Sequence, residues 1–373
     1  MSDNVGNHRC TLGTDGVNFV THSVDGGRRP MTSPAFGCVA CMLAAMGEFD
    51  LIARYFTRPT ARAVLGVGDD CALLQPAPGT QLAISSDMLV EGRHFFADVD
   101  PAALGHKALA VNLSDLAACG ATPLAFTLAL ALPRVDEAWL EAFSRGLLAL
   151  ADAHGCELVG GDTTRGPLNI CITVFGEVPV VNGRSQALLR SGARPGDDIY
   201  VSGTLGDARL ALDALRGSIA LPTDLLAQAR ERLERPTPRV ALGQALRGVA
   251  SAALDISDGL LGDLRHMLKA SGAGATLDTS IAMQLIAACT HPACTNGLIS
   301  LKKQLEYVLA GGDDYELAFT APVSAREAVQ AAARHAGTPV TRIGRIDAEP
   351  GLRLVDGQGQ PLAGDFSSFD HFA

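Results

Sequence analysis

Hydrophobic and polar residues recur along the first half of the chain with the periods of short helices and strands. Between Glu48 and Phe56, the apolar residues Phe49, Ile52 and Phe56 are spaced by three and four, which predicts an amphipathic helix. Two more helices are expected, over the alanine-rich segment 102–119 and over the amphipathic segment 137–153. Strands are expected over 64–67, 82–85, 126–132, 158–159 and 169–181. This alternation predicts a mixed α/β unit.

A change in composition separates the two halves of the chain. Residues 190–198 (RSGARPGDD) are rich in glycine, proline and charge, which is typical of a domain boundary. Beyond them, strands are expected over 199–202, 253–256 and 315–320, with helices that begin after Gly206 and Gly259. We therefore expect one domain over 47–187 and a second over 188–373.

Residues 1–46 precede the first predicted helix and are expected to be a disordered extension, or to arise from a start codon assigned too far upstream. Arg28 and Arg29 come before an apolar segment, as in an export signal. That segment contains prolines and no clear cleavage site, so export is the less favoured interpretation.

Aspartate recurs beside glycine or serine where apolar segments end. These acidic segments are Gly68-Asp69-Asp70, Ser85-Ser86-Asp87, Ser114-Asp115, Gly160-Gly161-Asp162, Asp255-Ile256-Ser257-Asp258 and Gly311-Gly312-Asp313-Asp314. We expect loops at all of them except Ser114-Asp115, which lies in the helix expected over 102–119. Any one of them alone could simply cap a helix or form a turn. If the fold gathers several, two carboxylates about 4 Å apart repel by roughly 4 kcal/mol at an effective dielectric constant near 20. Such a cluster needs cations, and ligands that are all oxygen favour Mg²⁺.

The charge balance supports a role for metal ions. The net charge is −10, and the only lysines are Lys107, Lys269, Lys302 and Lys303, so nucleic acid is a poor candidate partner. Phosphates could still bind through Mg²⁺, which suits phosphoryl transfer between two polyanions. The chain has no P-loop, no GxGxxG, no protein-kinase motifs and no GxSxG. It is therefore an ATP user of an unusual type, or not an ATP user.

The cysteines and the lengths of the apolar runs indicate the cellular compartment in which the protein functions. Nine cysteines show no disulfide framework, which fits reduced thiols and a cytoplasmic location. The spacing of Cys289, His291 and Cys294 is not one that zinc sites use. The longest apolar run, Leu124 to Leu132, has nine residues, whereas a membrane helix needs about twenty. No membrane association is expected.

Several segments, in this order along the chain, resemble the bacterial thiamine-monophosphate kinase family of the aminoimidazole-ribotide-synthetase-like (PurM-like) superfamily. They are GEFDLIARYF (47–56), GVGDDCALL (66–74), ISSDMLVEGRHF (84–95), HKALAVNLSDLAACGATP (106–123), GGDTTRGP (160–167), LDISDGLLGDL (254–264), GGDDYELAF (311–319) and FDHF (369–372). The resemblance implies an α/β (α+β) fold of two domains, with mixed sheets flanked by helices and first-domain sheets that pair in a homodimer. It also implies direct transfer of the γ-phosphoryl group of ATP to thiamine monophosphate, with no covalent nucleophile.

The resemblance also implies roles for individual residues. The positions that match Mg²⁺ ligands are Asp70, Ser85, Ser86, Asp87, Asp115, Asp162, Asp255 and Asp258. Those that match nucleotide contacts are Phe143, Gly161, Asp162, Arg190 and Ser257. Those that match substrate contacts are His94, Asp313 and Phe366, with Phe369 as a substitute for Phe366. Two of these depart from the family pattern, since Asp313 stands where glutamate is usual and Phe366 where tryptophan is usual.

Other functions stay open at this point. Within the superfamily the chain could be another ATP-dependent synthetase. Outside it, the same carboxylates could serve a magnesium-dependent phosphohydrolase or a non-catalytic nucleotide- or metal-binding scaffold.

Overall fold

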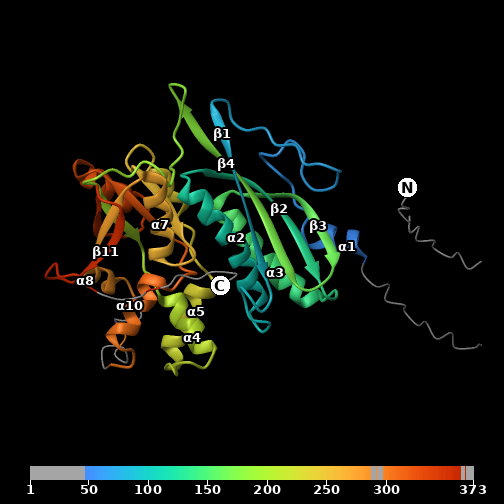
Figure 1. The fold of residues 1–373 in the computed structure, drawn as a ribbon. Helices are drawn as coiled ribbons and strands as arrows, with labels where there is room; N and C mark the ends of the chain where they lie inside the picture. The colour runs from blue at the N-terminus through green and yellow to red at the C-terminus, as the bar shows by residue number, and fades with distance from the viewer. Residues whose placement is uncertain (1–46, 287–290, 292–296, 363–365, 367–373) are drawn as a thin grey trace, which may run out of the picture. The chain divides into compact units, whose positions relative to one another are not determined.

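The computed structural model describes residues 47–286, 291, 297–362 and 366. The described residues belong to one compact unit that contains two β-sheets (Figure 1). The strands are β1 (Thr80–Val90), β2 (Thr122–Leu132), β3 (Glu157–Arg165), β4 (Asn169–Val181), β5 (Arg184–Ser185), β6 (Asp198–Ser202), β7 (Ala252–Ile256), β8 (Gly274–Asp278), β9 (Glu316–Ala321), β10 (Val340–Asp347) and β11 (Gly351–Val355). The α-helices are α1 (Glu48–Tyr55), α2 (Pro101–Ala118), α3 (Glu137–His154), α4 (Asp207–Leu215), α5 (Thr223–Glu234), α6 (Val240–Ala245), α7 (Leu260–Ser271), α8 (Thr279–Ala282), α10 (Leu301–Ala310) and α11 (Arg326–His335).

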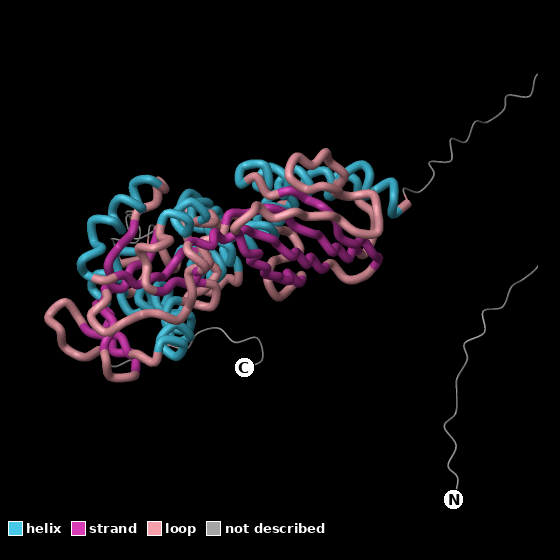
Figure 2. The backbone as a smooth tube through the Cα atoms, turned by 90° about the horizontal axis from the view of Figure 1, so that it is seen from above, coloured by secondary structure: helices cyan, strands magenta, loops and turns pink. Residues whose placement is uncertain are grey.

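The first sheet has the strand order β1-β4-β2-β3, with β5 attached to β4. Strand β4 runs antiparallel to β1 and β2, whereas β2 and β3 are parallel. Helices α2 and α3 cover one face of this sheet, and no helix of the described residues lies on the other face (Figures 1 and 2). The two helices pack backbone to backbone, because a Cβ on Gly105 or on Gly146 would clash with a carbonyl group of the other helix. This close packing fixes α2 on the sheet.

The second sheet has the strand order β11-β8-β10-β6-β9-β7 and is antiparallel except for the β11–β8 pair. Strands β7 and β9 are buried throughout, which agrees with their mostly apolar sequences, while Asp255 and Glu316 are buried charged exceptions. Helix α7 packs against β7 and directly follows it in the chain. Because Ile256 at the end of β7 pairs with Glu316 at the start of β9, the carboxyl end of β7 lies beside the loop that precedes β9.

One hydrophobic core joins the two halves of the chain. It contains α2, α3 and first-sheet residues such as Phe126, together with Leu317 and Phe319 of β9. A second core lies wholly within the second half. The first sheet ends at Ser185 and the second begins at Asp198, so the predicted boundary at 187/188 falls between them and stays a prediction.

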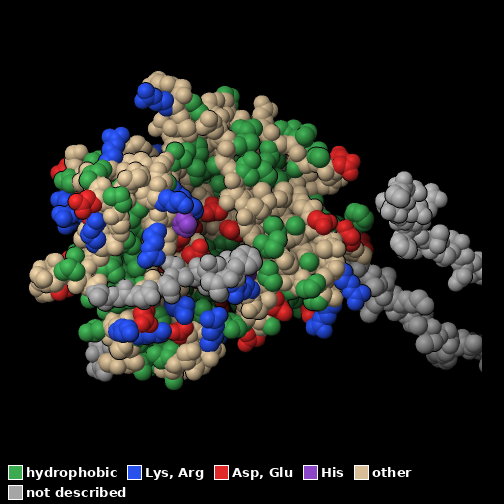
Figure 3. Space-filling view, viewed as in Figure 1, with side chains coloured by type: hydrophobic (Ala, Val, Ile, Leu, Met, Phe, Trp, Pro, Cys, Tyr) green, Lys and Arg blue, Asp and Glu red, His purple; other side chains and the backbone are tan. Residues whose placement is uncertain are grey.

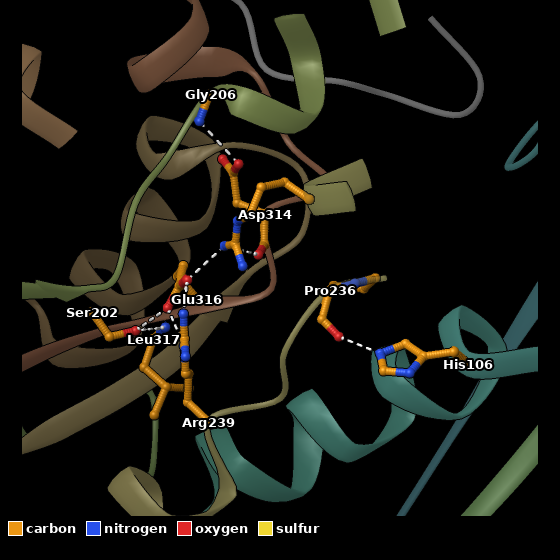
Figure 4. A network of polar contacts seen from close by, with 9 residues as sticks. His106, Ser202, Gly206, Pro236, Arg239, Asp314, Glu316 and Leu317 are labelled. Carbon is orange, nitrogen blue, oxygen red and sulfur yellow. Dashed lines mark hydrogen bonds and ion pairs between the residues drawn. The ribbon is translucent and has the colours of Figure 1, made fainter. Parts of the chain in front are cut away.

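A buried polar network holds β9 in place (Figure 4). Glu316, which is fully buried, accepts hydrogen bonds from Ser202 Oγ at 2.6 Å and from the guanidinium groups of Arg232 and Arg239. The neighbouring Asp314 accepts a hydrogen bond from the Gly206 N–H at 2.9 Å. This network anchors the last turn of α5, the start of α6 and the start of α4 to β9 and the loop that precedes it.

Most predicted elements are present, but several predicted loops are wrong. The segment 64–67 forms only isolated bridges, not a strand. Ser85-Ser86-Asp87 lies within β1 and Gly160-Gly161-Asp162 within β3, whereas Ser114-Asp115 lies within α2, in agreement with the helix expected over 102–119. Strand and helix therefore orient these side chains, and each adjacent pair in a strand faces opposite sides of the sheet. Among the described residues, no helix has the length and apolar character needed to cross a bilayer.

Candidate functional site

A cavity of about 610 Å³ lies where the two sheets meet α2. Four residues of α2 line it, Leu104, Lys107, Val111 and Asp115. Their spacings of three and four place them on one face of the helix. Strand β1, the end of β7 and the loop before β9 supply most of the remaining acidic wall. In the space-filling view, acidic side chains, arginines or lysines and a histidine lie close together near the middle of the side of the molecule that is shown (Figure 3).

Three carboxylates from three different elements meet in this cavity. Asp87 of β1 lies beside α2, and its backbone N–H donates to Asn112 Oδ1 at 3.1 Å. Asp115 of α2 accepts a hydrogen bond from Ser85 Oγ. Asp255, near the end of β7, accepts a hydrogen bond from Ser114 Oγ at 2.7 Å. The fold thus brings Ser85, Asp87, Asp115 and Asp255 close together, and their role as metal ligands stays a prediction.

The pKa values of these three carboxyl groups are all raised above the ordinary value for aspartate. Burial and the neighbouring charge of Asp115 raise the pKa of Asp87 to about 6. Burial first, and then the charge of Asp115, raises the pKa of Asp255. Burial also raises the pKa of Asp115, although the Ser85 hydrogen bond and Arg190 oppose this. A cation in the cavity would relieve this repulsion.

The start of α7 forms a further part of the wall. Ser257 and Asp258 line the cavity, and their backbone N–H groups each donate to Asp263 Oδ2 at 3.0 Å. Burial raises the pKa of Asp263 to about 6. Asp263 was not among the predicted site residues, although its position in the first turn of a helix that follows Ser-Asp-Gly was visible in the sequence. It holds the loop and leaves the Asp258 side chain for the cavity.

A second cavity, of about 590 Å³, lies at the other edge of the first sheet. It is lined by Asp70, by Gly161 and Asp162 of β3, and by apolar side chains of α1 such as Phe49 and Ile52. Gly161 has φ +147°, and a Cβ there would clash with the backbone of Leu128. Only glycine fits this position.

The strand register shows how far apart the two cavities lie. Asp87 pairs with Ile172, Ile172 with Leu128, and Leu128 with Gly161, so Asp87 and Gly161 lie in one row across four strands. With neighbouring strands about 4.8 Å apart, the two residues are separated by about 14 Å. Asp162 lies in the adjacent row, and its side chain points to the opposite face from Asp87. Within one chain, Asp87 and Asp162 cannot share one metal ion.

The remaining predicted metal ligand is Ser86. Its Oγ contacts Thr173 Oγ1 at 2.9 Å and donates to the Ile172 carbonyl at 3.1 Å, on the face without helices. The Ser86 side chain therefore points away from the cavity that Asp87 lines.

Some of the predicted substrate and nucleotide contacts line the first cavity, whereas others lie outside it. His94, Arg190 and Asp313 line the first cavity, and His94 Nδ1 accepts the Val90 N–H at 3.0 Å. Phe143 lines neither cavity, because its side chain is fully buried in the core and stacks on Trp139 with ring centroids 4.8 Å apart. The structure therefore does not place Phe143 where it could contact a nucleotide.

The last predicted substrate contact lies near the C-terminus. Phe366 packs, partly buried, against the second core and is not among the residues that line the first cavity. Its suggested substitute Phe369 lies outside the described residues, as do Cys289 and Cys294.

Several residues that line the first cavity were missed in the sequence. Lys107 and Tyr315 lie among its carboxylates, and Arg209 and Arg216 enter from α4. Lys107 could have been found, since it is eight residues before Asp115 and so lies on the same helical face.

The residues present fit a hard divalent cation, because the converging side-chain donors are oxygens and the carboxylates repel one another. Among the described residues, no group of three or more carboxylate, histidine or cysteine side chains is already gathered at metal-binding distances. Ligation by the first cavity would therefore also use phosphate oxygens or water, which Mg²⁺ commonly retains.

Two family models match the chain. The model of the N-terminal domain of AIR synthase related proteins matches residues 68–178, and the model of the C-terminal domain matches residues 194–357. The thiamine-monophosphate kinase of Salmonella typhimurium (strain LT2) is 48% identical over 334 residues, which are 88% of this chain and 99% of that protein.

Solved structures give a matching result. The crystal structure of thiamine-monophosphate kinase from Stenotrophomonas maltophilia K279a aligns with a TM-score of 0.72 at 45% identity and covers 82% of this chain and 94% of that chain. A structure of AaThiL complexed with AMPPCP and TMP aligns with a TM-score of 0.67 at 29% identity, over 80% of this chain and 89% of that one.

Proposed function

The chain belongs to the thiamine-monophosphate kinase family, and on this premise we propose that it transfers the γ-phosphoryl group of ATP to thiamine monophosphate. One observation carries the proposal, the meeting of Asp87, Asp115 and Asp255 in a cavity that also contains Arg190 and Lys107. A related protein of known structure binds AMPPCP, an analogue of ATP, together with TMP. A site for two phosphate-bearing molecules needs both the acidic and the basic residues of this cavity.

Asp87, Asp115, Asp255 and Asp258 would hold Mg²⁺ in the first cavity. When bound there, Mg²⁺ supplies positive charge that offsets the repulsion between the two phosphate-bearing substrates. Asp70 and Asp162, at the second cavity, would bind metal only together with groups from elsewhere, since Gly161, the neighbour of Asp162, lies about 14 Å from Asp87 along one row of paired residues.

The acceptor needs no activation by a nucleophilic side chain. A phosphate monoester has a second pKa near 6, so its oxygen is already anionic at neutral pH. That oxygen forms a bond to the γ-phosphorus of ATP while the bond from this phosphorus to the β-bridging oxygen breaks, which yields thiamine diphosphate and ADP. The task of the chain is then to align the two molecules. Arg190 and Ser257 are proposed to hold the nucleotide, and His94 and Asp313 the acceptor.

The nucleotide base is proposed to occupy the second cavity, where Gly161 allows close approach to the backbone of β3. Phe143 is omitted from this proposal because it is buried in the core. Phe366 stays a predicted substrate contact whose position outside the cavity walls gives it no geometric support.

We also propose that two copies of the chain pair through the helix-free face of the first sheet. Leu82, Ile84 and Met88 alternate along β1, point to this face and are 44%, 60% and 53% exposed. Three exposed large apolar side chains on one face of a strand are typical of an interaction surface. Ser86 and Asp162 lie on the same face, so pairing would bring these predicted ligands toward a second chain. Ile84→Arg is expected to give monomers in analytical ultracentrifugation, and a wild-type monomer would contradict the proposal.

The reaction is proposed to take place in the cytoplasm. Among the described residues, Cys71, Cys119, Cys156 and Cys171 are free thiols, which fits a reducing compartment.

A turnover assay tests the proposed reaction. The protein is incubated with ATP and Mg²⁺, with and without thiamine monophosphate, and ADP and thiamine diphosphate are quantified. The expected result is equal amounts of both products, formed only when thiamine monophosphate is present, and none after chelation of Mg²⁺. ADP release at the same rate without the acceptor would favour a phosphohydrolase, and consumption of ATP only with a different acceptor would favour another synthetase.

A further inference from the structure

Lys107 is a buried lysine in the wall of the first cavity. Its side chain is only 4% exposed, and its Nζ lies 2.9 Å from Asp313 Oδ1. By contrast, Lys269 and Lys302 lie on exposed surfaces of α7 and α10. Burying an ammonium group is costly unless it is paired. The pair connects α2 to the loop before β9, and thus the two AIR synthase related domains.

The chain around Asp313 is held in an uncommon conformation. Asp313 has φ +59° and Tyr315 has φ +50°, both in the left-handed region that side chains disfavour. The Asp313 N–H donates to the Ser257 carbonyl at 2.8 Å, which ties the loop to the start of α7. Tyr315 Oη lies 3.4 Å from Asp313 Oδ1, the same oxygen that Lys107 contacts. Oδ1 is thus held from two sides, and the second carboxylate oxygen is available to the cavity.

The cavity changes character along α2. Asp115 lies at its carboxylate end, and at a rise of 1.5 Å per residue Lys107 is about 12 Å farther along the helix axis. The lining also includes the apolar side chains Val99, Leu104, Leu212 and Leu233, with the charged residues Arg209, Arg216 and Glu234 beside them. A ligand with a phosphate at one end and an organic ring system at the other fits this order, with the Lys107–Asp313 pair between the two ends.

We propose that Lys107 is a positioning residue for the acceptor substrate. Its ammonium group fixes the Asp313 carboxylate so that the second oxygen can accept a hydrogen bond from the organic part of the substrate. It also neutralises a carboxylate that would otherwise add to the charge of Asp87 and Asp255. This inference rests on the proposed phosphoryl transfer, and it assigns Lys107 to recognition of the acceptor and not to binding of ATP.

Three variants test the inference, Lys107→Met, Lys107→Arg and the matched control Lys302→Met on exposed α10. Lys107→Met is expected to raise KM for thiamine monophosphate by about tenfold or more, since a hydrogen bond between charged groups is lost. KM for ATP is expected to change by less than about twofold. Lys107→Arg, which keeps a charged donor, should recover part of the loss, and Lys302→Met should match the wild type. Calorimetric titration of thiamine monophosphate in the presence of AMPPCP gives the same comparison without turnover.

A double-mutant cycle with Asp313→Asn shows whether the two residues act as one unit. If Lys107 acts through Asp313, KM for thiamine monophosphate of the double variant is no higher than that of the more impaired single variant. The inference is overturned if Lys107→Met leaves KM for thiamine monophosphate unchanged, or raises KM for ATP by the same factor. It is also overturned if the increases in KM for thiamine monophosphate of the two single variants multiply in the double variant. If Lys107→Met does not fold, Asp313→Asn and Lys107→Arg decide the question through the same two KM values. Absence of turnover by the wild type would instead refute the proposed function.

Discussion

Replacement of Asp87 by asparagine should stabilise the metal-free protein while it removes activity. The pKa of Asp87 is raised from an ordinary value of 3.8 to about 6, chiefly by burial and then by the charge of Asp115. A carboxyl group with a raised pKa contributes its full stability below its unfolded pKa and loses it as the pH rises through the folded pKa. At pH 8 the ionised Asp87 therefore destabilises the metal-free fold, and Asp87→Asn removes that charge with little change in shape.

The size of the effect follows from the shift. About two pH units correspond to roughly 3 kcal/mol at 1.36 kcal/mol per unit. Because Asp87 is only partly buried, solvent screening reduces the expected gain to about 1–2 kcal/mol. The gain should shrink as the pH falls below about 6, where the wild-type carboxyl takes up its proton.

Urea denaturation in EDTA at pH 8 and at pH 5 measures this free energy of unfolding, and the turnover assay measures activity. Added Mg²⁺ should stabilise the wild type more than the variant, because ligands that bind only the folded state shift unfolding by mass action. Asp115→Asn serves as a parallel case and Asp152→Asn, on the exposed end of α3, as the control. A variant that is less stable than the wild type in EDTA at pH 8, or one that keeps full turnover, would refute the reasoning.

Three further predictions concern other parts of the fold. Gly161→Ala should raise KM for ATP and cost about 1–3 kcal/mol of stability, because its φ of +147° and the contact with Leu128 exclude a side chain. The control is Gly166→Ala, whose Cβ would meet only the Ala131 side chain, at an ordinary contact distance of 3.5 Å. Equal KM values for the two variants would count against this prediction. Glu316→Gln should lower the free energy of unfolding by about 3–5 kcal/mol, since it leaves two partly buried guanidinium groups without their anionic partner. A loss no larger than that of exposed Glu327→Gln would contradict this prediction. Asp198→Asn should lower the free energy of unfolding by about 1 kcal/mol at pH 7, because hydrogen bonds and charge from two arginines lower the pKa of this carboxyl group. This loss of stability should vanish as the pH falls below about 4, where the wild-type carboxylate takes up a proton. A loss that persists in acid would show that charge is not the cause.

The sequence predicts the regular elements of the first half well, because their periods are clear. The apolar spacing from Phe49 to Phe56 matches α1, and the β-rich segment 169–181 coincides with β4. The failures occur where polar side chains occupy element interiors. Ser85-Ser86-Asp87 reads as a loop, yet it is the middle of β1, because the buried face of that strand carries polar groups that α2 satisfies.

The candidate site shows the same limit. The sequence identifies Asp87, Asp115 and Asp255 as carboxylates of one site, and the fold brings them together. It cannot give the strand register, which separates Asp87 from Gly161 by about 14 Å and divides the predicted ligands between two cavities. The sequence also does not show the close α2–α3 packing that buries the Phe143 side chain, so the nucleotide contact at Phe143 stays a prediction without support from the lining of either cavity.

The core that joins the two halves has a consequence for synthesis on the ribosome. Strands β1 to β5 are complete at Ser185, but Leu317 and Phe319, which belong to the same core, follow about 130 residues later. At 5–20 residues per second, the nascent first half waits about 7–26 s for them. During that time apolar surface that β9 will cover is exposed to solvent and to neighbouring chains. We therefore expect newly made first halves to be clients of chaperones until β9 emerges.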